Sequence, residues 1–514
     1  MKHNSILSID IGTTAIKTGL FSIAGDMIAF DSQENPLIFL KNGGVEQNPY
    51  SSWEIIVNSV KRLTQNINKN DVGVISLSVQ RGTVIPLSED GEPLGNLVVW
   101  MDKRGLPLID EIKAAIDEET YYYGSGHPIS YITGLSKLIW FQREAENLWG
   151  KINVISSPET LFLNWLGCEE SVCAHSSGTF LFPFDITQKV WNNEILSKLQ
   201  YPSDKLPELV SSIDIVGYLS KKAAEELDLP EGIPLVAGGG DGQCAATGCG
   251  VIDVGRCMIN LGTGCGVQTY LPEPVFDPKM ILNCGAHVVP QAWEMEGHTQ
   301  SSGATFKWFR DQFGGLEMGL ENYSQINAFD QLVQQAVLSP PGCDGLVFIP
   351  TLNGSTAPVL AQEAKGLLIG LSLSHTRNHI IRSVLEGITL EIRGLLDSIR
   401  ETGAPIEEIR LVGGGSKNPH WNQIHADILN SPINVLENSE AALVGAAMCG
   451  AVAIKEYADL SEASAKFVKT KEVIKPRKAY RTLYDTAFHN YQNIFQLLIK
   501  NQIYQDLSAQ KLSN

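Results

Sequence analysis

Apolar residues form short runs, each closed by a turn, over the first hundred positions of the chain. Four runs rich in β-branched and aromatic side chains predict strands, at residues 6–9, 15–22, 73–78 and 83–87. Between the second and third runs, residues 53–64 repeat apolar positions with the period of a helix. From about residue 106 to 166 the pattern is mainly helical. The N-terminal part therefore predicts a mixed α/β domain.

The later part of the chain repeats this mixture of patterns. A charged amphipathic connector, residues 205–231, precedes a predicted strand at 234–237 that runs into three glycines. Further strands are predicted at 258–267 and 409–412, and helices at 376–402, 419–429, 439–454 and 480–500. The length of 514 residues exceeds what one hydrophobic core usually supports. We therefore expect two domains, 1–250 and 251–514, related by a quasi-repeat.

One short motif occurs in both halves. The segment Ser8–Lys17 joins two apolar runs through Gly12-Thr13-Thr14, and Met258–Val267 does so through Gly262-Thr263-Gly264, with Asn260 in place of Asp10. Backbone N–H groups and a hydroxyl in such a turn suit phosphate oxygens. Each turn could also be an ordinary hairpin connection. Two copies favour a pair of domains that bind one nucleotide.

Four glycine-rich segments each follow a predicted strand, at residues 10–14, 238–242, 262–266 and 413–416. None contains the Gly-Lys-Ser/Thr of a Walker A loop, and none fits G-x-G-x-x-G, because Gln243, Val267 and Asn418 stand at the third glycine position. A P-loop enzyme and a nicotinamide enzyme are therefore disfavoured.

Two aspartates lie at predicted strand ends beside these glycines. Asp10 adjoins the first Gly-Thr turn and could hold Mg²⁺ against a triphosphate, or it could only stabilise the turn. Asp241 follows three glycines and could accept a proton from an attacking hydroxyl. It could equally cap the helix that follows, and the two roles are compatible.

A third group surrounds a predicted turn at residues 89–91. Gln80, Arg81, Trp100 and Asp102 could face one pocket and hydrogen-bond a polyhydroxylated substrate. The alternative is a surface salt bridge beside a core tryptophan. His375 and His379 stand four residues apart on a predicted helix, but no acidic motif adjoins them, so we expect a structural pair and no metal site.

Bulk properties restrict the partners. The net charge of −18 argues against nucleic acid and anionic membranes. Nine cysteines without a CxxC pair favour buried thiols in a reducing compartment. No signal peptide and no apolar run of membrane-spanning length is recognised, so a cytoplasmic location is expected.

In this order, these elements resemble the FGGY family of carbohydrate kinases over nearly the whole chain. Gly366–Leu371, seven further residues and then His379–Glu386 match the family's C-terminal signature. Lys137–Glu144 matches the second half of the other signature, whereas residues 132–136 depart from it. The resemblance implies two actin-like, ribonuclease-H-like ATPase domains flanking a deep catalytic cleft. It also implies ATP-dependent phosphorylation of a sugar or polyol hydroxyl.

Carried over by position, the resemblance assigns roles to individual residues. Asp10 corresponds to the magnesium-associated acid, and Asp241 to the catalytic base that also binds substrate. The ATP-binding positions are Gly12, Thr13, Thr14, Gly262, Thr263, Gly264, Gly303, Lys307, Gly414, Gly415 and Asn418. The segment 440–447 is implied to lie near the adenosine site.

The substrate is less well specified. Gln80-Arg81 followed by Thr83 resembles glycerol kinase, but Gly82 replaces the acid found there, which we expect to leave room for a longer substrate. Gly238–Asp241 resembles the xylulose kinase branch, and His287–Pro290 resembles kinases of the autoinducer-2 type. We favour a pentulose such as xylulose, with glycerol, another polyol or an autoinducer-2-type substrate as alternatives. An actin- or chaperone-like ATPase is the alternative of a different class. A homodimer is the family-level expectation.

Overall fold

The first apolar runs form a six-stranded sheet in the computed structural model of the protein, which describes residues 5–509. β1 (Ser5–Ile11) pairs antiparallel with β2 (Ala15–Ser22) and parallel with β6 (Val72–Val79), and β15 (Pro234–Gly240) extends the parallel part beyond β6. The sheet order is β14 (Ile215–Tyr218), β15 (Pro234–Gly240), β6 (Val72–Val79), β1 (Ser5–Ile11), β2 (Ala15–Ser22) and β3 (Met27–Glu34).

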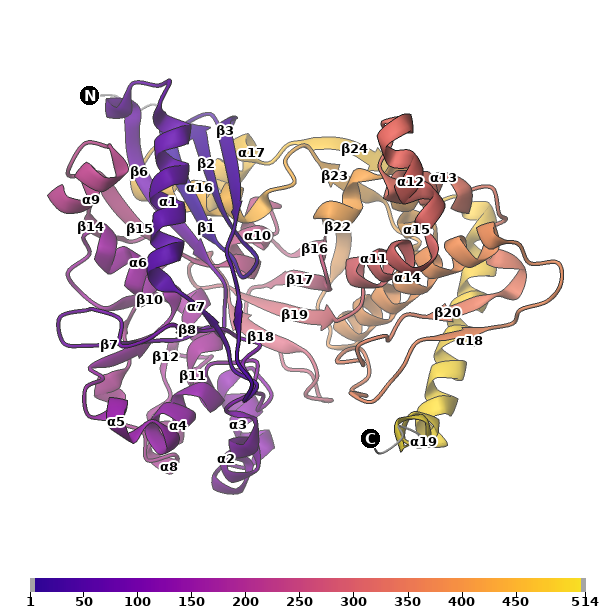
Figure 1. Ribbon diagram of the computed structural model, residues 1–514, viewed down its shortest axis with the longest axis horizontal. Helices are drawn as coiled ribbons and strands as arrows, with labels where there is room; N and C mark the ends of the chain where they lie inside the picture. The colour runs from indigo at the N-terminus through magenta and orange to yellow at the C-terminus, as the bar shows by residue number, and fades with distance from the viewer. Residues whose placement is uncertain (1–4, 510–514) are drawn as a thin grey trace. The chain divides into compact units, whose positions relative to one another are not determined.

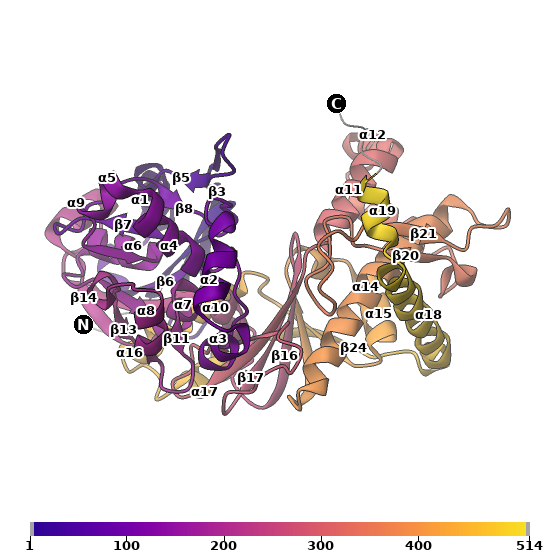
Figure 2. The same ribbon diagram turned by 90° about the horizontal axis from the view of Figure 1, so that it is seen from below.

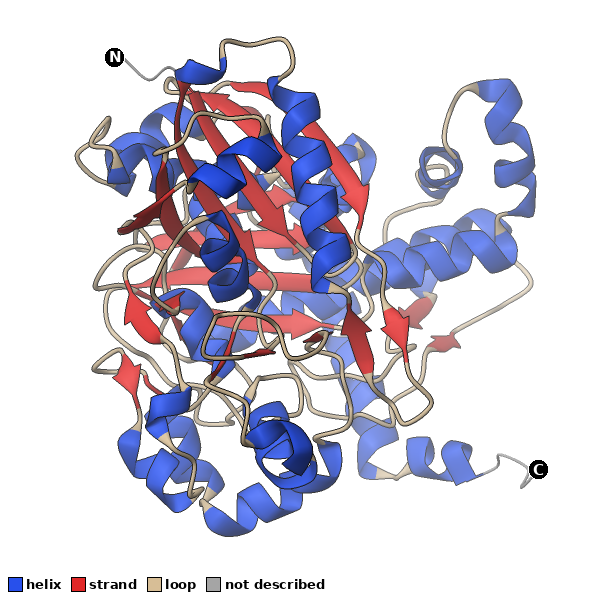
Figure 3. Cartoon of the chain, turned by 60° about the vertical axis from the view of Figure 1, so that its left-hand side comes forward, coloured by secondary structure: helices blue, strands red, loops and turns tan. Residues whose placement is uncertain are grey.

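Helices cover both faces of this sheet because successive strand residues point to opposite sides (Figure 3). Leu7, Ile75 and Leu235 pack on one side in a core shared with α1 (Pro49–Thr64), α6 (Pro158–Leu166) and α9 (Lys221–Leu227). Their neighbours Ile6, Val74 and Val236 pack on the other side with α16 (Ala441–Ala453) and α17 (Leu460–Phe467). Figure 1 shows α1 crossing in front of the first sheet.

A second sheet repeats the arrangement of the first. Its order is β18 (Asn283–Ala286), β19 (Trp293–Thr299), β17 (Cys265–Leu271), β16 (Gly255–Leu261), β22 (Ile406–Val412), β23 (Ile433–Leu436) and β24 (Thr470–Ile474). β16 pairs antiparallel with β17 and parallel with β22, as β1 does with β2 and β6. Asp10 is opposite Ser78, and Asn260 is opposite Val412, at the same distance from the strand ends. The quasi-repeat predicted from the Gly-Thr motif is therefore present in the strand order and the register.

The chain forms two compact units, but they do not divide it into two continuous halves. Unit 1 extends to Val254 and also contains Tyr270–Met295 and Glu440–Lys469. Unit 2 contains Gly255–Thr269, Glu296–Ser439 and the chain from Thr470 onward. The expected border at residue 250 lies next to the first of these changes. The two later segments of unit 1 were not expected.

The remaining elements surround the two sheets. In unit 2, α14 (Arg377–Glu401) packs against α13 (Ala328–Ala336) and α15 (Pro419–Leu429). α15 also packs against α18 (Arg481–Lys500), and Figure 2 shows α14, α15 and α18 together. The other helices of unit 1 are α2 (Ile109–Ala115), α3 (Glu118–Ser125), α4 (Leu135–Glu144), α5 (Glu146–Trp149), α7 (His175–Leu181), α8 (Asn193–Lys198) and α10 (Asp241–Gly248). Those of unit 2 are α11 (Gly303–Phe313), α12 (Gly315–Ser324), α13 (Ala328–Ala336), α14 (Arg377–Glu401), α15 (Pro419–Leu429), α18 (Arg481–Lys500) and α19 (Ile503–Ala509).

Short strands complete the fold. They are β4 (Ile38–Phe39), β5 (Val45–Gln47) and β8 (Leu97–Val98) in one small sheet, and four pairs: β7 (Ile85–Leu87) with β9 (Val154–Ser156), β10 (Val172–Ala174) with β13 (Glu208–Val210), β11 (Phe184–Asp185) with β12 (Val190–Trp191), and β20 (Val347–Ile349) with β21 (Leu367–Ile369). All nine cysteines are free and buried, as expected. Within residues 5–509, no helix has the length and apolar character needed to cross a membrane.

Candidate active site

The first Gly-Thr turn is a tight reversal between β1 and β2. The N–H of Gly12 donates to the carbonyl of Ala15 at 3.1 Å, and a Cβ at position 12 would lie 2.8 Å from that oxygen. Thr13 is held by two side chains: its hydroxyl donates to Gln80 Oε1 at 2.8 Å and accepts from Trp100 Nε1 at 2.9 Å. The Thr13 hydroxyl is thus engaged within unit 1, whereas Thr14 is exposed.

Gln80 holds this turn through its buried side chain. Its side chain is 1% exposed, its oxygen also accepts from Thr83, and its NH₂ group donates to Gln47 Oε1 at 2.7 Å. Gln47 in turn donates to the Thr13 carbonyl at 2.6 Å. These contacts account for most of the hydrogen-bonding capacity of Gln80. The structure therefore gives Gln80 a positioning role behind the Thr13 turn, and the predicted substrate contact stays a prediction.

Arg81 connects two carboxylates. Its Nε lies 3.2 Å from Asp241 Oδ1, and its Nη1 lies 3.8 Å from Glu294 Oε1. The guanidinium carbon stands 4.1 Å from the centre of the Phe180 ring. Asp241 is the first residue of α10, and its Oδ1 also accepts the N–H of Gly242 at 2.8 Å. Gly240, not Asp241, occupies the cap position of that helix. With 41% of its side chain exposed, Asp241 is accessible to a ligand.

Asp10 lies deeper in unit 1, where the charge of Asp241 acts on it. The Ser78 hydroxyl donates to Asp10 Oδ1 at 2.7 Å, and Asp10 is 8% exposed. Burial, followed by the negative charge of Asp241, raises the pKa of Asp10 to about 7. The carboxylate oxygens of Asp10 and Asp241 are hard, acidic ligands of the kind that Mg²⁺ prefers. The residues present therefore fit the predicted magnesium-associated role.

The structure contradicts two expectations for this region. Asp102 is fully buried, and its carboxylate accepts from the backbone of Val45 at 2.8 Å and from the Arg104 guanidinium at 2.8 Å, so we assign it no substrate contact. Gly82 has a φ of +67°, and a Cβ there would lie 2.4 Å from the Ile132 carbonyl. The space beside Gly82 is thus filled by backbone and is not room for a longer substrate.

Two buried polar side chains beside Arg81 were not predicted. Glu294, in β19, is 0% exposed, and Gln243, in the first turn of α10, is also 0% exposed. Both point at the same place, since a Cβ on Gly285 would lie 3.2 Å from Glu294 Oε1 and 3.5 Å from Gln243 Nε2. Neither amide atom of Gln243 has a hydrogen-bond partner within residues 5–509. A buried amide of this kind is expected to meet a ligand or ordered water. Sequence spacing offered no signal for Glu294.

Backbone hydrogen bonds from the start of α11 hold the second Gly-Thr turn in unit 2. The N–H of Gly303 donates to the Gly262 carbonyl at 3.1 Å, and that of Ala304 to the Thr263 carbonyl at 2.8 Å. A Cβ on Gly303 would lie 2.4 Å from the Gly262 carbonyl, and one on Gly264 2.6 Å from the Thr299 carbonyl. The predicted residues Gly262, Thr263, Gly264 and Gly303 therefore form one backbone arrangement in unit 2.

The third glycine segment of unit 2 adjoins the same strand. Gly413 has a φ of +85°, and a Cβ there would lie 2.6 Å from Asn260 Oδ1. A Cβ on Gly414 would meet nothing within 4 Å, whereas one on Gly415 would lie 2.8 Å from Leu261 Cβ. Asn418 caps α15 and donates to Asp330 Oδ1 at 2.5 Å.

One further residue, Lys307, and one segment, 440–447, were predicted for the nucleotide site. Lys307 lies on α11 with 63% of its side chain exposed and pairs with Asp311 at 2.6 Å. The segment 440–447 belongs to unit 1, where Glu440 pairs with Lys17 at 2.6 Å and α16 packs against β1 and α10.

Only His379 of the histidine pair lies on α14, which begins at Arg377, whereas His375 precedes the helix. Both histidines make local structural contacts, as expected. His379 Nδ1 forms the capping box with Thr376, and His375 Nδ1 accepts the N–H of Ser372 at 2.9 Å. Within residues 5–509, no three or more His, Cys, Asp or Glu side chains are grouped as a metal site.

Comparisons with known proteins agree with this geometry. Residues 5–248 match the model described as "FGGY family of carbohydrate kinases, N-terminal domain", and residues 257–454 match that of the C-terminal domain. The chain is 29% identical over 493 residues to a xylulose kinase of Bacillus subtilis, covering 95% of this chain and 96% of the relative. It is 28% identical to a gluconokinase of the same organism, covering 93% and 94%.

The fold is likewise shared with solved structures. The ligand-bound xylulose kinase of Lactobacillus acidophilus superimposes with a TM-score of 0.89 at 24% identity, covering 96% of this chain and 98% of that one. The predicted two-domain actin-like α/β fold is thereby confirmed, and the chain is a sugar kinase, a transferase that acts on a small-molecule sugar. Because both family models match and together span most of the sequence, this chain belongs to the FGGY family of carbohydrate kinases.

Proposed function

We propose that this enzyme transfers the γ-phosphoryl group of ATP to a hydroxyl of a small neutral ketose, a pentulose such as xylulose. The observation that carries the proposal is the position of Asp241. Its carboxylate lies at the open start of α10, with the Arg81 guanidinium at 3.2 Å. A carboxylate there can accept the proton of an attacking hydroxyl.

Each unit would contribute one part of the reaction. In unit 1, Arg81 offsets the negative charge of Asp241 and fixes its orientation, so that the carboxylate can orient and deprotonate the acceptor hydroxyl. In unit 2, the backbone N–H groups of the turn at residues 262–264 and the segment 413–418 would hold the phosphates and the adenosine of ATP. Mg²⁺ bound near Asp10 would neutralise phosphate charge.

The charges around Arg81 favour a neutral acceptor over a sugar acid. One guanidinium stands between two carboxylates, those of Asp241 and Glu294, and Asp10 adds a third acidic group close to Asp241. A substrate carboxylate would add another negative charge to this partly buried group. The amide of Gln243 offers a donor and an acceptor to hydroxyl or carbonyl groups instead. Gluconate, the substrate named for one relative, is therefore disfavoured here.

An ADP-release assay over pentuloses, hexuloses, glycerol, gluconate and the autoinducer-2 precursor tests the proposal. We expect the highest kcat/KM with a pentulose and at least a hundredfold lower value with gluconate. Asp241→Asn should abolish transfer while ATP still binds, whereas the exposed control Asp253→Asn should match wild type. ATP hydrolysis that no acceptor stimulates, or near-normal turnover in Asp241→Asn, would refute the mechanism.

A further inference from the structure

A polar pocket lies in unit 1, formed by residues other than those around Arg81 and Asp241. Its volume is about 160 Å³. Its walls come from the start of α7, the turn between β11 and β12, the segment before β14 and the hairpin between β18 and β19. Half of the lining residues carry hydroxyl or amide groups: Thr187, Gln188, Ser211, Ser212 and Gln291.

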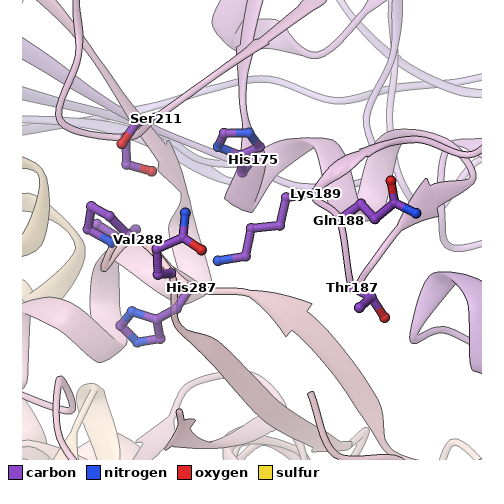
Figure 4. Close-up of a pocket in the computed structure, with 10 residues that line it drawn as sticks. His175, Thr187, Gln188, Lys189, Ser211, His287 and Val288 are labelled. Carbon is purple, nitrogen blue, oxygen red and sulfur yellow. The ribbon is translucent and has the colours of Figure 1, made fainter. Parts of the chain in front are cut away.

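One charged group points into this space. Figure 4 places the ammonium end of Lys189 in the middle of the labelled residues, between His175 and Ser211 on one side and His287 on the other. Lys189 is only 9% exposed. Its Nζ donates to the Ala292 carbonyl at 2.8 Å and stands 4.1 Å from the centre of the Trp293 ring.

Among residues 5–509, the ammonium of Lys189 has no anionic partner. Its contacts within residues 5–509 are a carbonyl and an aromatic ring, and no carboxylate lies within 4 Å. Burial lowers the pKa of Lys189 to about 8. Asp214, next to the same wall, directs its carboxylate to the backbone N–H of Ser211 at 2.9 Å. A buried charge is normally paired, because leaving water is costly for an ion.

We propose that this pocket binds the oxyanion of a small phosphorylated or carboxylated metabolite, with Lys189 as the charged contact. An ammonium has three N–H donors, and the Ala292 carbonyl uses one of them. Ser211, Ser212 and Gln291 line the same pocket and carry further donors for a bound oxyanion. Thr187 and Gln188 also line it, on the side of Lys189 away from its ammonium (Figure 4). The pocket volume is about 160 Å³. One water needs roughly 15 Å³ of cavity volume, so the pocket has room for a ligand of about ten non-hydrogen atoms.

Lys205 provides a control for the proposed role of Lys189. Its Nζ also donates to a carbonyl, that of Ile152, and stands 5.1 Å from the centre of the Trp149 ring. Lys205 does not line the pocket. If carbonyl and indole contacts alone determined the behaviour of such a lysine, the two residues would respond alike.

Isothermal titration of the full-length enzyme at pH 7 and constant ionic strength tests the site, with inorganic phosphate, acetate and chloride as separate probes. We expect wild type to bind phosphate or acetate but not chloride, Lys189→Met to bind at least tenfold more weakly, and Lys205→Met to stay within twofold of wild type. Ser212→Ala, which keeps the lysine, should weaken binding about threefold. The turns of unit 2 are unchanged in all variants, so any phosphate bound there cancels in the comparison.

The two oxyanion probes distinguish the sources. Tighter binding of phosphate indicates a phosphorylated metabolite, and tighter binding of acetate indicates a carboxylated one. Equal affinity in wild type, Lys189→Met and Ser212→Ala, or no binding of either oxyanion to wild type, would overturn the proposal. Because the readout is binding, the result does not depend on phosphoryl transfer.

Discussion

Gly445→Ala is expected to displace the helix that begins with Asp241. Gly445 lies in α16, which packs against α10 within unit 1. A Cβ on Gly445 would lie 1.9 Å from the Cys244 carbonyl oxygen and 3.0 Å from the N of Gly248. Gly248 is equally close in the opposite direction, since its Cβ would lie 1.9 Å from the Ala441 carbonyl oxygen.

The size of the effect follows from these distances. The atoms in the way are backbone, so no side chain can turn aside. Ordinary contact begins at 3.4 Å, so the two helices must separate by about 1.5 Å. Overpacking of this kind costs about 3 kcal/mol of folding free energy. Cys244 is within one turn of Asp241, and a misplacement of about 1 Å can lower the rate about a hundredfold.

Gly450→Ala in the same helix is the matched control. A Cβ there would meet Ile6 Cγ2 and Val74 Cγ1 at 3.2 Å, both of which are side-chain atoms that can yield slightly. Thermal melting and the ADP-release assay check the pair. Gly445→Ala should melt several degrees lower and turn over about a hundredfold more slowly, whereas Gly450→Ala should stay near wild type. Equal behaviour of the two variants would refute the argument from backbone contact.

Two further outcomes are expected. Burial raises the pKa of Glu159 to about 7, above its unfolded value of 4.5, so the folded state loses stability as the pH rises through this window. The loss is about 3 kcal/mol. Glu159→Gln should therefore flatten the dependence of the melting temperature on pH between 5 and 8. The same slope in the variant and in wild type would contradict this prediction. Gly82→Ala should lower the melting temperature more than Gly91→Ala. Both glycines have positive φ, but a Cβ at position 91 meets nothing within 4 Å, and one at position 82 meets the Ile132 carbonyl. An equal decrease would contradict the contact at position 82.

Local patterns predicted the strands and helices that carry the site. The helix expected at 419–429 coincides with α15, and the one expected at 376–402 with α14 (Arg377–Glu401). The helix expected at 53–64 begins earlier, at Pro49, because the Asn48 side chain accepts the N–H groups of Tyr50 and Ser51. Asn followed by Pro is a helix start signal that apolar periodicity does not register. Part of the region interpreted as a connector, residues 205–231, forms β13, β14 and α9.

Contacts between distant segments account for what the sequence did not reveal. Asp102 has the residue type of a sugar ligand, but Arg104, two positions on, engages its carboxylate. Gly82 has the residue type that would leave space for a substrate, but the Ile132 carbonyl occupies the place that a side chain there would need. Glu294 and Gln243 both lie close to Gly285 in unit 1, although they are far apart in the sequence, and no spacing along the chain encodes this proximity.

The assignment of α16 to unit 1 also determines when that unit can fold during synthesis. The first sheet is complete once β15 has been made, but the helix that covers its second face begins only at Ala441. At about 5 to 20 residues per second, the ribosome needs roughly 10 to 40 s to reach it. During this interval the apolar face formed by Ile6, Val74 and Val236 lacks its cover. Unit 1 begins first, yet its core closes only when most of unit 2 has already left the ribosome.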